Sequence, residues 1–478
     1  MTQQQTVEQQ ATPVLRHRGA ILAIILLSYF MILLDNSVIF TALPSIQADM
    51  GLTTGQLTWV QNAYTLVFGG LLLLGARAGD LLGRRAVFIT GLAVFSLASL
   101  LIGLAPTDWW LIAARAIQGI GAAIVAPSAL SLITANFPSG RERARAIALY
   151  GATAGIGASL GLVVGGALTE LISWRAGFFL NVPIGIAMIM LAPRFLPESS
   201  RARGRFDLFG ALTATFGVGS IVFAIVHAAD AGWASAATIV ALTIGIVLLV
   251  GLVLNEARAT QPIMPLRLFR SRSRLAGYLG RMLYLGAMIG FFYFTTQYLQ
   301  NVLGFTPLQA GLGFLPMTVV NFAVAMLIPP IVRRLGETLP LLVGIAFTLA
   351  GMLWLSRLTT DTDYLIGVAL PMILIGIGQG LTFAPLTSAG IAGIDKADAG
   401  AASGLVNTFH QMGMSLGLSV LVAVSASALT GDGTQRAQIT REVGAALMGS
   451  SGMLALCLVV CAALILPTKK TTKIGEYT

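Results

Sequence analysis

The chain has 478 residues, of which 56% are hydrophobic and only 10% are charged. A soluble domain averages about 25% charged residues, so this composition excludes a water-soluble globule. The net charge of +10 would suit a nucleic-acid-binding protein, but the chain has no basic soluble domain to carry it.

Apolar runs that are long enough to cross about 30 Å of hydrocarbon as helices recur along the whole chain. They predict an all-α integral membrane protein with 14 transmembrane helices, not a β-barrel, whose strands would alternate over about ten residues. The expected spans are 20–44, 57–76, 86–105, 109–135, 145–169, 176–196, 208–229, 236–255, 275–298, 308–331, 338–356, 365–390, 401–428 and 445–467.

Lys and Arg residues are distributed unevenly over the segments between these spans. With the N-terminus inside, the inner segments carry most of the 29 basic residues, and the outer segments keep only Arg175, Arg357, Arg436 and Arg441. The positive-inside rule then places both termini in the cytoplasm. We expect the protein to be integral to the cytoplasmic (inner) membrane. The basic charge therefore marks topology and attraction to anionic lipid, and we expect no nucleic-acid partner.

The second part of the chain repeats motifs of the first in the same order, roughly 250–258 residues later. Gly51–Gln56 is echoed by Gly304–Gln309, and Gly119–Pro127 by Gly376–Pro385. This indicates two six-helix halves in parallel repeat, an arrangement that places a substrate path between the halves. The expected units are a tail at 1–19, a first half at 20–196, a linker with an inserted helix pair at 197–257, a second half at 258–467 and a tail at 468–478.

Asp35 stands inside the first expected span, where a charge costs at least ~2.5–3.5 kcal/mol. Arg115 on the fourth span lies at a matching depth, since both residues are about 10 Å below the expected outer surface. Burial and a nearby guanidinium act in opposite directions on the proton affinity of a carboxylate. We therefore interpret Asp35 as a proton-binding group and Arg115 as its modulator; a fixed structural ion pair is the alternative.

Residues 76–85, ARAGDLLGRR, form a charged connection between the second and third spans on the expected inner side. This stretch resembles the signature loop of the major facilitator superfamily, Gly-x-Leu-Ala-Asp-Arg-x-Gly-Arg-Arg, although leucine replaces the first arginine at Leu81. The resemblance implies a gating loop formed by the matching residues Asp80, Gly83, Arg84 and Arg85.

Further motifs are similar to those of the 14-span drug:proton antiporter family within that superfamily. They are Arg115-Ala-Ile-Gln118-Gly119-Ile-Gly121 on the fourth span, 34–44 on the first, 59–64 on the second and 174–185 on the sixth. The family's exporter helix carries a Gly-Pro pair, and here Leu162 stands where that proline is expected. The resemblance covers nearly the whole chain and implies export of drugs in exchange for protons.

Polar residues within the spans must face protein or water. Asn407, His410 and Gln411 lie within one turn of the thirteenth span, although interhelical hydrogen bonding explains Asn407 and Gln411 equally well. We expect the substrate cavity to be lined by Asn36, Tyr64, Gln118, Asn181, Tyr293, Gln297, Asn407, His410 and Gln411.

Arg281 lies two turns into the ninth span, and we expect its side chain to extend back to the cytoplasmic surface, with substrate contact as the alternative. Aromatic residues crowd the same helix at 291–298. Such a cluster usually serves packing or an interfacial belt, though an aromatic wall would also suit flat, apolar cations.

These patterns predict a proton-coupled efflux transporter that exports small amphipathic or cationic drugs by alternating access. The alternatives are a specific metabolite transporter of the same fold, a membrane enzyme and a non-transporting sensor. We expect no enzyme, because the chain shows no soluble catalytic loop, and no ATP use, because it has no GxxxxGK[ST] motif. Cys457 and Cys461 suit packing better than metal binding, so we expect no metal and no cofactor. The expected partners are protons, the substrate and the lipid bilayer; we expect a monomer, and the sequence gives no signal for an outer adaptor protein.

Overall fold

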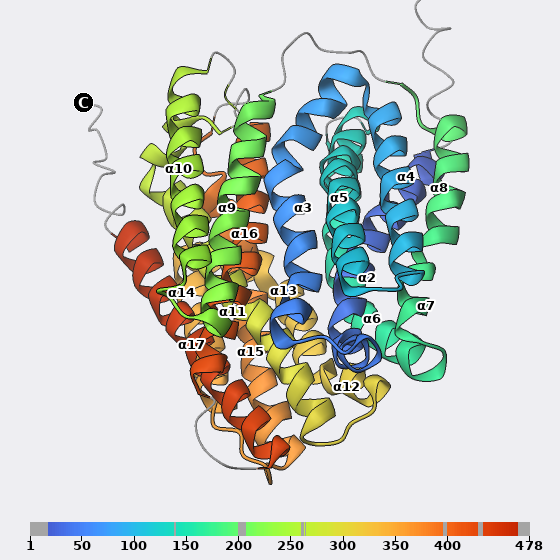
Figure 1. Cartoon of the computed structure of the whole chain (residues 1–478). Coiled ribbons are helices and arrows are strands. Elements are labelled where there is room, and N and C mark those ends of the chain that lie inside the picture. The colour runs from blue at the N-terminus through green and yellow to red at the C-terminus, as the bar shows by residue number, and fades with distance from the viewer. Residues whose placement is uncertain are drawn as a thin grey trace, which may run out of the picture.

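The computed structural model describes residues 18–137, 140–198, 207–259, 262, 264–394, 399–428 and 434–466. At Asp80 and a few other helical positions only the backbone is described. Within these ranges every regular element is a helix (Figure 1).

Fourteen helical segments in the described ranges are long and apolar enough to cross a membrane, as the apolar runs predict. Three of them consist of two consecutive elements, α7–α8, α12–α13 and η3–α15. The helices are α2 (Arg18–Met50), α3 (Thr54–Leu82), α4 (Arg84–Gly103), α5 (Asp108–Asn136), α6 (Arg141–Leu171), α7 (Trp174–Phe179), α8 (Asn181–Phe195), α9 (Leu208–Ala231), α10 (Ala236–Arg258), η2 (Leu266–Arg270), α11 (Arg272–Asn301), α12 (Pro307–Gly313), α13 (Leu315–Leu335), α14 (Thr338–Leu355), η3 (Leu365–Ala369), α15 (Leu370–Gly390), α16 (Ala399–Ser427) and α17 (Gln435–Ile465).

Several helices extend beyond the apolar runs that identify them. The largest difference is in α17, which begins at Gln435 rather than near residue 445. Thr434 caps this helix by accepting a hydrogen bond from the backbone N–H of Ala437, so the polar stretch that follows is already helical. Apolar runs mark the part of a helix that faces hydrocarbon, whereas the helix itself continues toward the headgroups.

The repeated Gly-x-Thr-x-x-Gln motif is a helix start. In the first copy Gly51 has φ +63°, and Thr53 and Gln56 form a reciprocal capping box at the beginning of α3. In the second copy Gly304 has φ +74°, and Thr306 and Gln309 form the same box at the beginning of α12. The motif recurs because both halves need a tight turn and a satisfied helix N-terminus at the same place.

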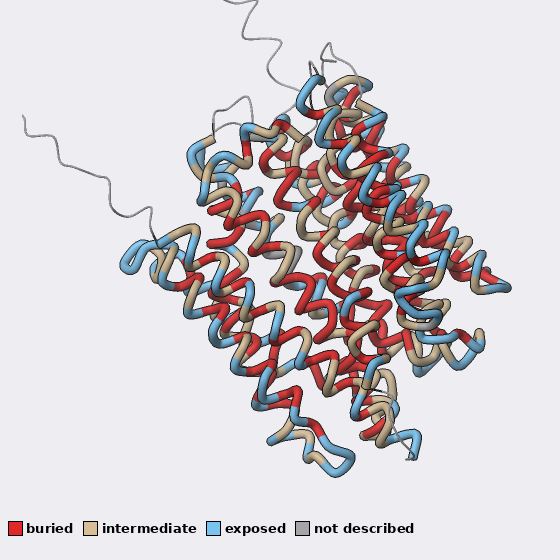
Figure 2. The backbone as a smooth tube through the Cα atoms, turned by 60° about the vertical axis from the view of Figure 1, so that its left-hand side comes forward, coloured by how far each residue is buried: buried red, intermediate tan, exposed pale blue. Residues whose placement is uncertain are grey.

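Helices α2–α8 pack as one half and α11–α17 as the other, with α9 and α10 on one side of the bundle (Figure 1). We call the end where α2 begins, with Arg18, Arg84 and Arg85, the basic end, and the end where α2 finishes at Met50 the opposite end. Buried residues follow the middle of the bundle, and exposed ones gather at its ends and on its outer faces (Figure 2).

Helices α3 and α16 form one seam between the halves, and it is closed along much of its length. Asn62 Nδ2 donates to Ser419 Oγ at 2.8 Å, and Thr408 Oγ1 donates to the carbonyl of Gly69 at 3.3 Å. Helix α9 covers this seam through an apolar cluster, Val218, Val222 and Val226 with Trp59, Leu66, Leu249, Met412 and Leu416. The inserted pair therefore packs against both halves.

The second seam, between α6 and α12–α13, is closed near the opposite end. A Cβ on Gly166 would lie 2.4 Å from the carbonyl oxygen of Pro307, and one on Gly311 would lie 2.4 Å from that of Leu162. The backbones therefore touch here, as small residues allow in membranes. Leu308 N–H also donates to Glu170 Oε2 at 3.0 Å.

Toward the basic end the same two helices carry exposed side chains. They are Ile147, Leu149 and Ile156 on α6 and Phe322, Met326 and Leu327 on α13. Phe40 and Phe292 on the neighbouring α2 and α11 stack at 5.3 Å, and Gln300 Nε2 donates to the carbonyl of Thr41 at 3.0 Å, again toward the opposite end. On this side the contacts between the halves lie near the opposite end, and α6 has few contacts with α13.

Helices α11 and α16 approach closely enough that we expect Gly417→Val to destabilise the protein. A Cβ at Gly417 would lie 2.3 Å from the Cα of Gly286, so a branched side chain must push the two helices apart. Overpacking of this kind costs ~1–3 kcal/mol, which should lower the unfolding temperature of the detergent-purified protein. The control is Gly452→Val on α17, where a Cβ meets nothing within 4 Å. An equal fall in both variants would contradict the prediction.

Candidate functional site

Asp35 is buried on α2, with a side chain that is only 1% exposed. Its Oδ2 accepts a hydrogen bond from Arg115 Nη1 at 3.0 Å. Its Oδ1 accepts from Gln118 Nε2 at 2.9 Å and from Asn181 Nδ2 at 2.7 Å. Both carboxylate oxygens are thus bound by protein groups, one of them a full positive charge.

Arg115 is fully buried and is held by more than the carboxylate. Its Nε donates to the carbonyl of Val60 at 3.0 Å, and its Nη1 donates to Gln118 Oε1 at 2.6 Å. The ring of Tyr64 lies 4.3 Å from the guanidinium carbon, within range of a cation–π interaction. The arginine therefore ties α5 to both α2 and α3.

The packing of α5 explains why these side chains converge. A Cβ on Gly119 would lie 2.7 Å from the carbonyl oxygen of Tyr64, and one on Gly121 would lie 2.6 Å from the amide nitrogen of Phe95. These glycines let α5 touch α3 and α4. Arg115 and Gln118, one turn apart, then point between the helices toward α2.

Asn181 enters the network because α8 begins there, directly after the junction with α7 at Leu180. Ser99 on α4 completes it by accepting hydrogen bonds from Gln118 at 2.8 Å and Asn181 at 3.3 Å, while its own hydroxyl donates to the carbonyl of Phe95. Sequence reasoning missed Ser99, since a serine in an apolar span usually bonds only its own helix. The network joins five helices of the first half.

The other residues expected to line a cavity are spread over several sites. Asn36 Oδ1 accepts from Gln61 at 3.4 Å, and Gln297 Oε1 accepts from Asn301 at 2.7 Å. Tyr293 is buried. The structure therefore brings Tyr64, Gln118 and Asn181 into the surroundings of the Asp35–Arg115 pair. The side chains of Asn36, Gln297 and Tyr293 are not part of this network.

The three polar residues expected on one turn of α16 also lie in different surroundings. Asn407 is exposed and donates to the carbonyl of Ser403 at 3.1 Å. Gln411 is buried against Gly69 of α3, where it forms part of the closed seam. His410 faces the ring of Phe383 on α15 at 6.1 Å, and its Nδ1 is buried without a hydrogen-bond partner.

The expectation that Arg281 extends to the surface is wrong. The residue is 4% exposed, and its Nη1 donates to the carbonyl of Phe383 at 3.3 Å and to Thr387 Oγ1 at 3.0 Å. Its guanidinium carbon lies 3.7 Å from the centroid of the Phe383 ring. Helix α15 offers acceptors and an aromatic face nearby, so the side chain stays between the helices.

The stretch 76–85, expected as a loop, is mostly helical. Helix α3 continues to Leu82 and α4 begins at Arg84, and only Gly83, with φ +107°, separates them. Arg84 Nη1 donates to the carbonyl of Ser131 at 3.3 Å. Arg85 binds the carbonyl of Leu196 at 3.1 Å and pairs with Glu198 at 3.4 Å. The side chain of Asp80, predicted as part of this gate, lies outside the described residues.

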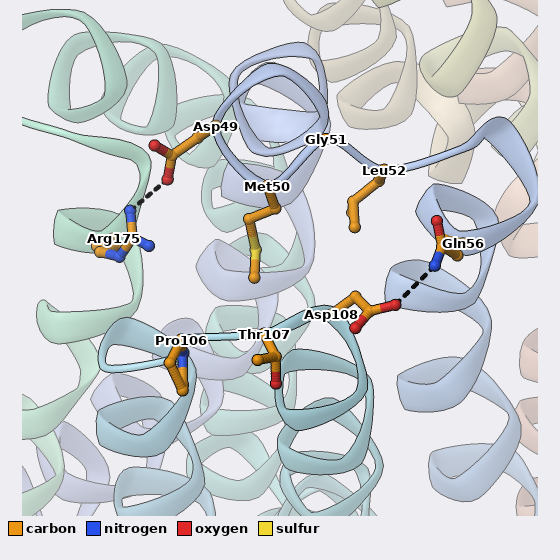
Figure 3. Close-up of a pocket in the computed structure, with 9 residues that line it drawn as sticks. All are labelled: Asp49, Met50, Gly51, Leu52, Gln56, Pro106, Thr107, Asp108 and Arg175. Carbon is orange, nitrogen blue, oxygen red and sulfur yellow. Dashed lines mark hydrogen bonds and ion pairs between the residues drawn. The ribbon is translucent and has the colours of Figure 1, made fainter.

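A polar cavity of about 380 Å³ lies at the opposite end of the first half (Figure 3). Asp49 at the end of α2 pairs with Arg175 at 2.5 Å and accepts from Trp174 Nε1 at 3.0 Å. Across the cavity, Gln56 donates to Asp108 at 2.6 Å. These contacts tie the ends of α2 and α3 to α7 and α5.

The two cysteines lie one turn apart on α17. Cys457 and Cys461 are buried against α11, with Cys457 Sγ 3.4 Å from the carbonyl oxygen of Gly280. In the part of the chain that the structure describes, no group of three His, Cys, Asp or Glu side chains is arranged to hold a metal ion.

Several named export and resistance proteins are similar in sequence. A cephamycin export protein of Amycolatopsis lactamdurans is 41% identical over 427 residues, covering 88% of this chain and 87% of the relative. A puromycin resistance protein of Streptomyces alboniger is 39% identical, covering 85% and 82%. A multidrug resistance protein of Mycobacterium tuberculosis is 36% identical, covering 84% and 75%.

Solved structures share the fold. A bacterial homologue of the human lysosomal transporter Spinster, in an inward-facing and unoccupied conformation, superposes with a TM-score of 0.65 at 17% identity, covering 95% of this chain and 96% of that one. A peptide transporter in complex with sulfate gives 0.66 at 13% identity, covering 93% and 94%. The sequence model of the Major Facilitator Superfamily matches residues 25–418. The chain therefore belongs to the Major Facilitator Superfamily and is a multi-pass membrane transporter.

Proposed function

We propose that this protein exports small amphipathic or cationic drugs across the cytoplasmic membrane in exchange for protons, as a monomer with both termini in the cytoplasm. The similar proteins named for cephamycin export, puromycin resistance and multidrug resistance support the export of such compounds. The predominance of basic residues at the end where α2 begins supports the orientation.

We infer proton coupling chiefly from one observation, the buried carboxylate of Asp35. It lies 17 residues from the start of α2, which is about 25 Å along the helix axis. An ionisable group at such a depth is costly and in transporters marks an ion or proton pathway. Asp35 is also the point at which side chains from α5 and α8 meet α2.

Protonation of Asp35 removes the charge that Arg115, Gln118 and Asn181 all contact. The helices joined through these hydrogen bonds are then free to shift against one another. Phe40 and Thr41, which bind α11 of the other half, lie less than two turns farther along α2. A movement of α2 is thereby passed to the interface between the halves.

The two seams define the alternating movement. The α3–α16 seam, covered by α9, acts as the side on which the halves stay together, while the α6–α12 contact near Glu170 breaks when the opposite end opens. In our proposed cycle the present arrangement opens toward the basic end, the cytoplasmic side in our proposed orientation, because the α6–α12 contact lies near the opposite end. Drug enters from there, and the proton enters from the other side.

We assign gating to the junction of α3 and α4. Arg84 and Arg85 bind the ends of α5 and α8 at the basic end, so they hold one arrangement of the first half. Asp80 belongs to this gate through its place in the motif. The moving units are 20–196 and 258–467, joined by 197–257, with tails at 1–19 and 468–478.

The electrochemical gradient of protons, which includes the membrane potential, can drive the cycle. Each elementary charge moved across 100 mV is worth about 2.3 kcal/mol, and about 1.4 kcal/mol corresponds to a tenfold concentration ratio. One proton therefore suffices for substantial accumulation of an uncharged drug.

Asp35→Asn should abolish pH-driven transport, because the amide cannot take up and release a proton at this position. The measurement is ethidium movement in proteoliposomes with an imposed pH gradient. Asp49→Asn is the matched control, since it removes an arginine-paired carboxylate from the same helix at an exposed position. If Asp35→Asn still transports like the wild type, the coupling role of Asp35 is wrong.

Cross-linking α6 to α12 should stop transport, because the contact must open during the cycle. We would introduce Glu170→Cys and Leu308→Cys into a variant lacking Cys457 and Cys461, and treat it with a short bismaleimide. Each single-cysteine variant, treated in the same way, controls for modification. Full transport by the cross-linked protein would show that this seam does not move.

A further inference from the structure

Two buried arginines in the described spans differ in their partners. Arg115 in the first half pairs with Asp35 at 3.0 Å. Arg281 in the second half is 4% exposed and forms no ion pair with any described carboxylate; its Nη1 binds a carbonyl and a hydroxyl of α15. Its Nε is buried without a hydrogen-bond partner.

Arg281 is deep in the membrane. It lies nine residues after the start of α11, or about 14 Å along the helix. A guanidinium there retains its charge, and an unpaired charge in a low-dielectric interior is expensive. Two neutral acceptors use a small part of its five N–H groups, so the guanidinium remains able to bind an anion.

The surroundings of Arg281 supply further donors and an apolar surface. The ring of Phe383 lies under the guanidinium, and the same ring meets His410 edge-on. The buried Nδ1 of His410 also has no partner. Three helices, α11, α15 and α16, therefore place two nitrogen-bearing side chains around one aromatic ring.

The helix that carries Arg281 also borders the other half of the protein. Helix α11, which carries Arg281, packs against α2 of the first half, and α2 carries Tyr29. Tyr29 stacks on Tyr150 of α6 with a ring separation of 4.0 Å. Arg281 therefore lies on a helix that borders the interface between the halves.

We propose that Arg281, with His410 beside it, binds an anionic group on those exported amphipathic molecules that carry one, so that amphipathic carboxylates are preferred over their neutral analogues. The Phe383 ring and the Tyr29–Tyr150 pair contact the apolar part. Charge-assisted hydrogen bonds from a guanidinium to a carboxylate are strong and directional, which suits this selection. The transport route rests on the proposed function, whereas the binding site does not.

Binding and transport are tested separately. Equilibrium dialysis of the full-length protein in lipid nanodiscs measures the affinities for cefoxitin, a carboxylate, and for its methyl ester. The variants are Arg281→Gln and Arg281→Lys, with Arg272→Gln as the control, since Arg272 is exposed on the same helix. Proteoliposomes then report movement of both compounds and of ethidium under a pH gradient.

We expect the wild type to bind the acid at least about tenfold more tightly than the ester. Arg281→Gln should lose this preference while keeping its affinity for the ester, Arg281→Lys should retain part of it, and Arg272→Gln should behave as the wild type.

Equal binding of acid and ester by the wild type would overturn the proposal, as would a preference that survives in Arg281→Gln. A parallel loss of both affinities would assign Arg281 to packing instead. If Arg281→Gln does not fold, the proposal is tested by the affinities of the wild type and of Arg281→Lys for the acid and the ester. If the protein prefers the acid but moves no compound under a pH gradient, the anion site stands and the proposed function is refuted. If it transports ethidium but shows no preference for the acid, the proposed function stands and the anion site is refuted.

Discussion

The buried ion pair between Asp35 and Arg115 is the interaction on which the first half depends. Both side chains are almost completely removed from solvent, and removing one partner of such a pair typically costs about 3–5 kcal/mol. The remaining polar atoms are therefore arranged around it, with Gln118 and Asn181 on the carboxylate and Val60 on the guanidinium. A pair that is costly to break and joins several helices is well suited to convert a change in charge into a change in packing.

Close backbone contact makes this network possible and also shapes the interface between the halves. Gly119 and Gly121 bring α5 against α3 and α4, while Gly166 and Gly311 bring α6 against α12. In a membrane there is little hydrophobic driving force between helices, so packing of small residues supplies much of the attraction. The glycines that position the ion pair in the first half thus have counterparts at the seam that opens in our proposed cycle.

The two halves surround their buried arginines with different groups. In the first half a resident carboxylate neutralises Arg115, whereas Arg281 in the second half meets only neutral acceptors and an aromatic ring. The inserted pair adds a further asymmetry, because α9 packs over the α3–α16 seam and leaves the α6–α13 side uncovered. The internal repeat therefore accounts for the framework, while the roles that we propose for Asp35 and Arg281 place proton coupling in one copy and anion binding in the other.

The amino-acid sequence by itself determined the 14 spans, because twenty apolar residues in a row have one stable arrangement in a bilayer. It also singled out Asp35, Arg115, Gln118 and Asn181 as individual residues. It also placed Asp35 and Arg115 at a matching depth. Only the tertiary structure decided that Gln118, Asn181 and Ser99 join this pair and that Asn407 does not, since contacts between helices depend on which faces meet. The same reason explains Arg281: its depth followed from its place in the span, but its direction depended on the acceptors that α15 happens to present.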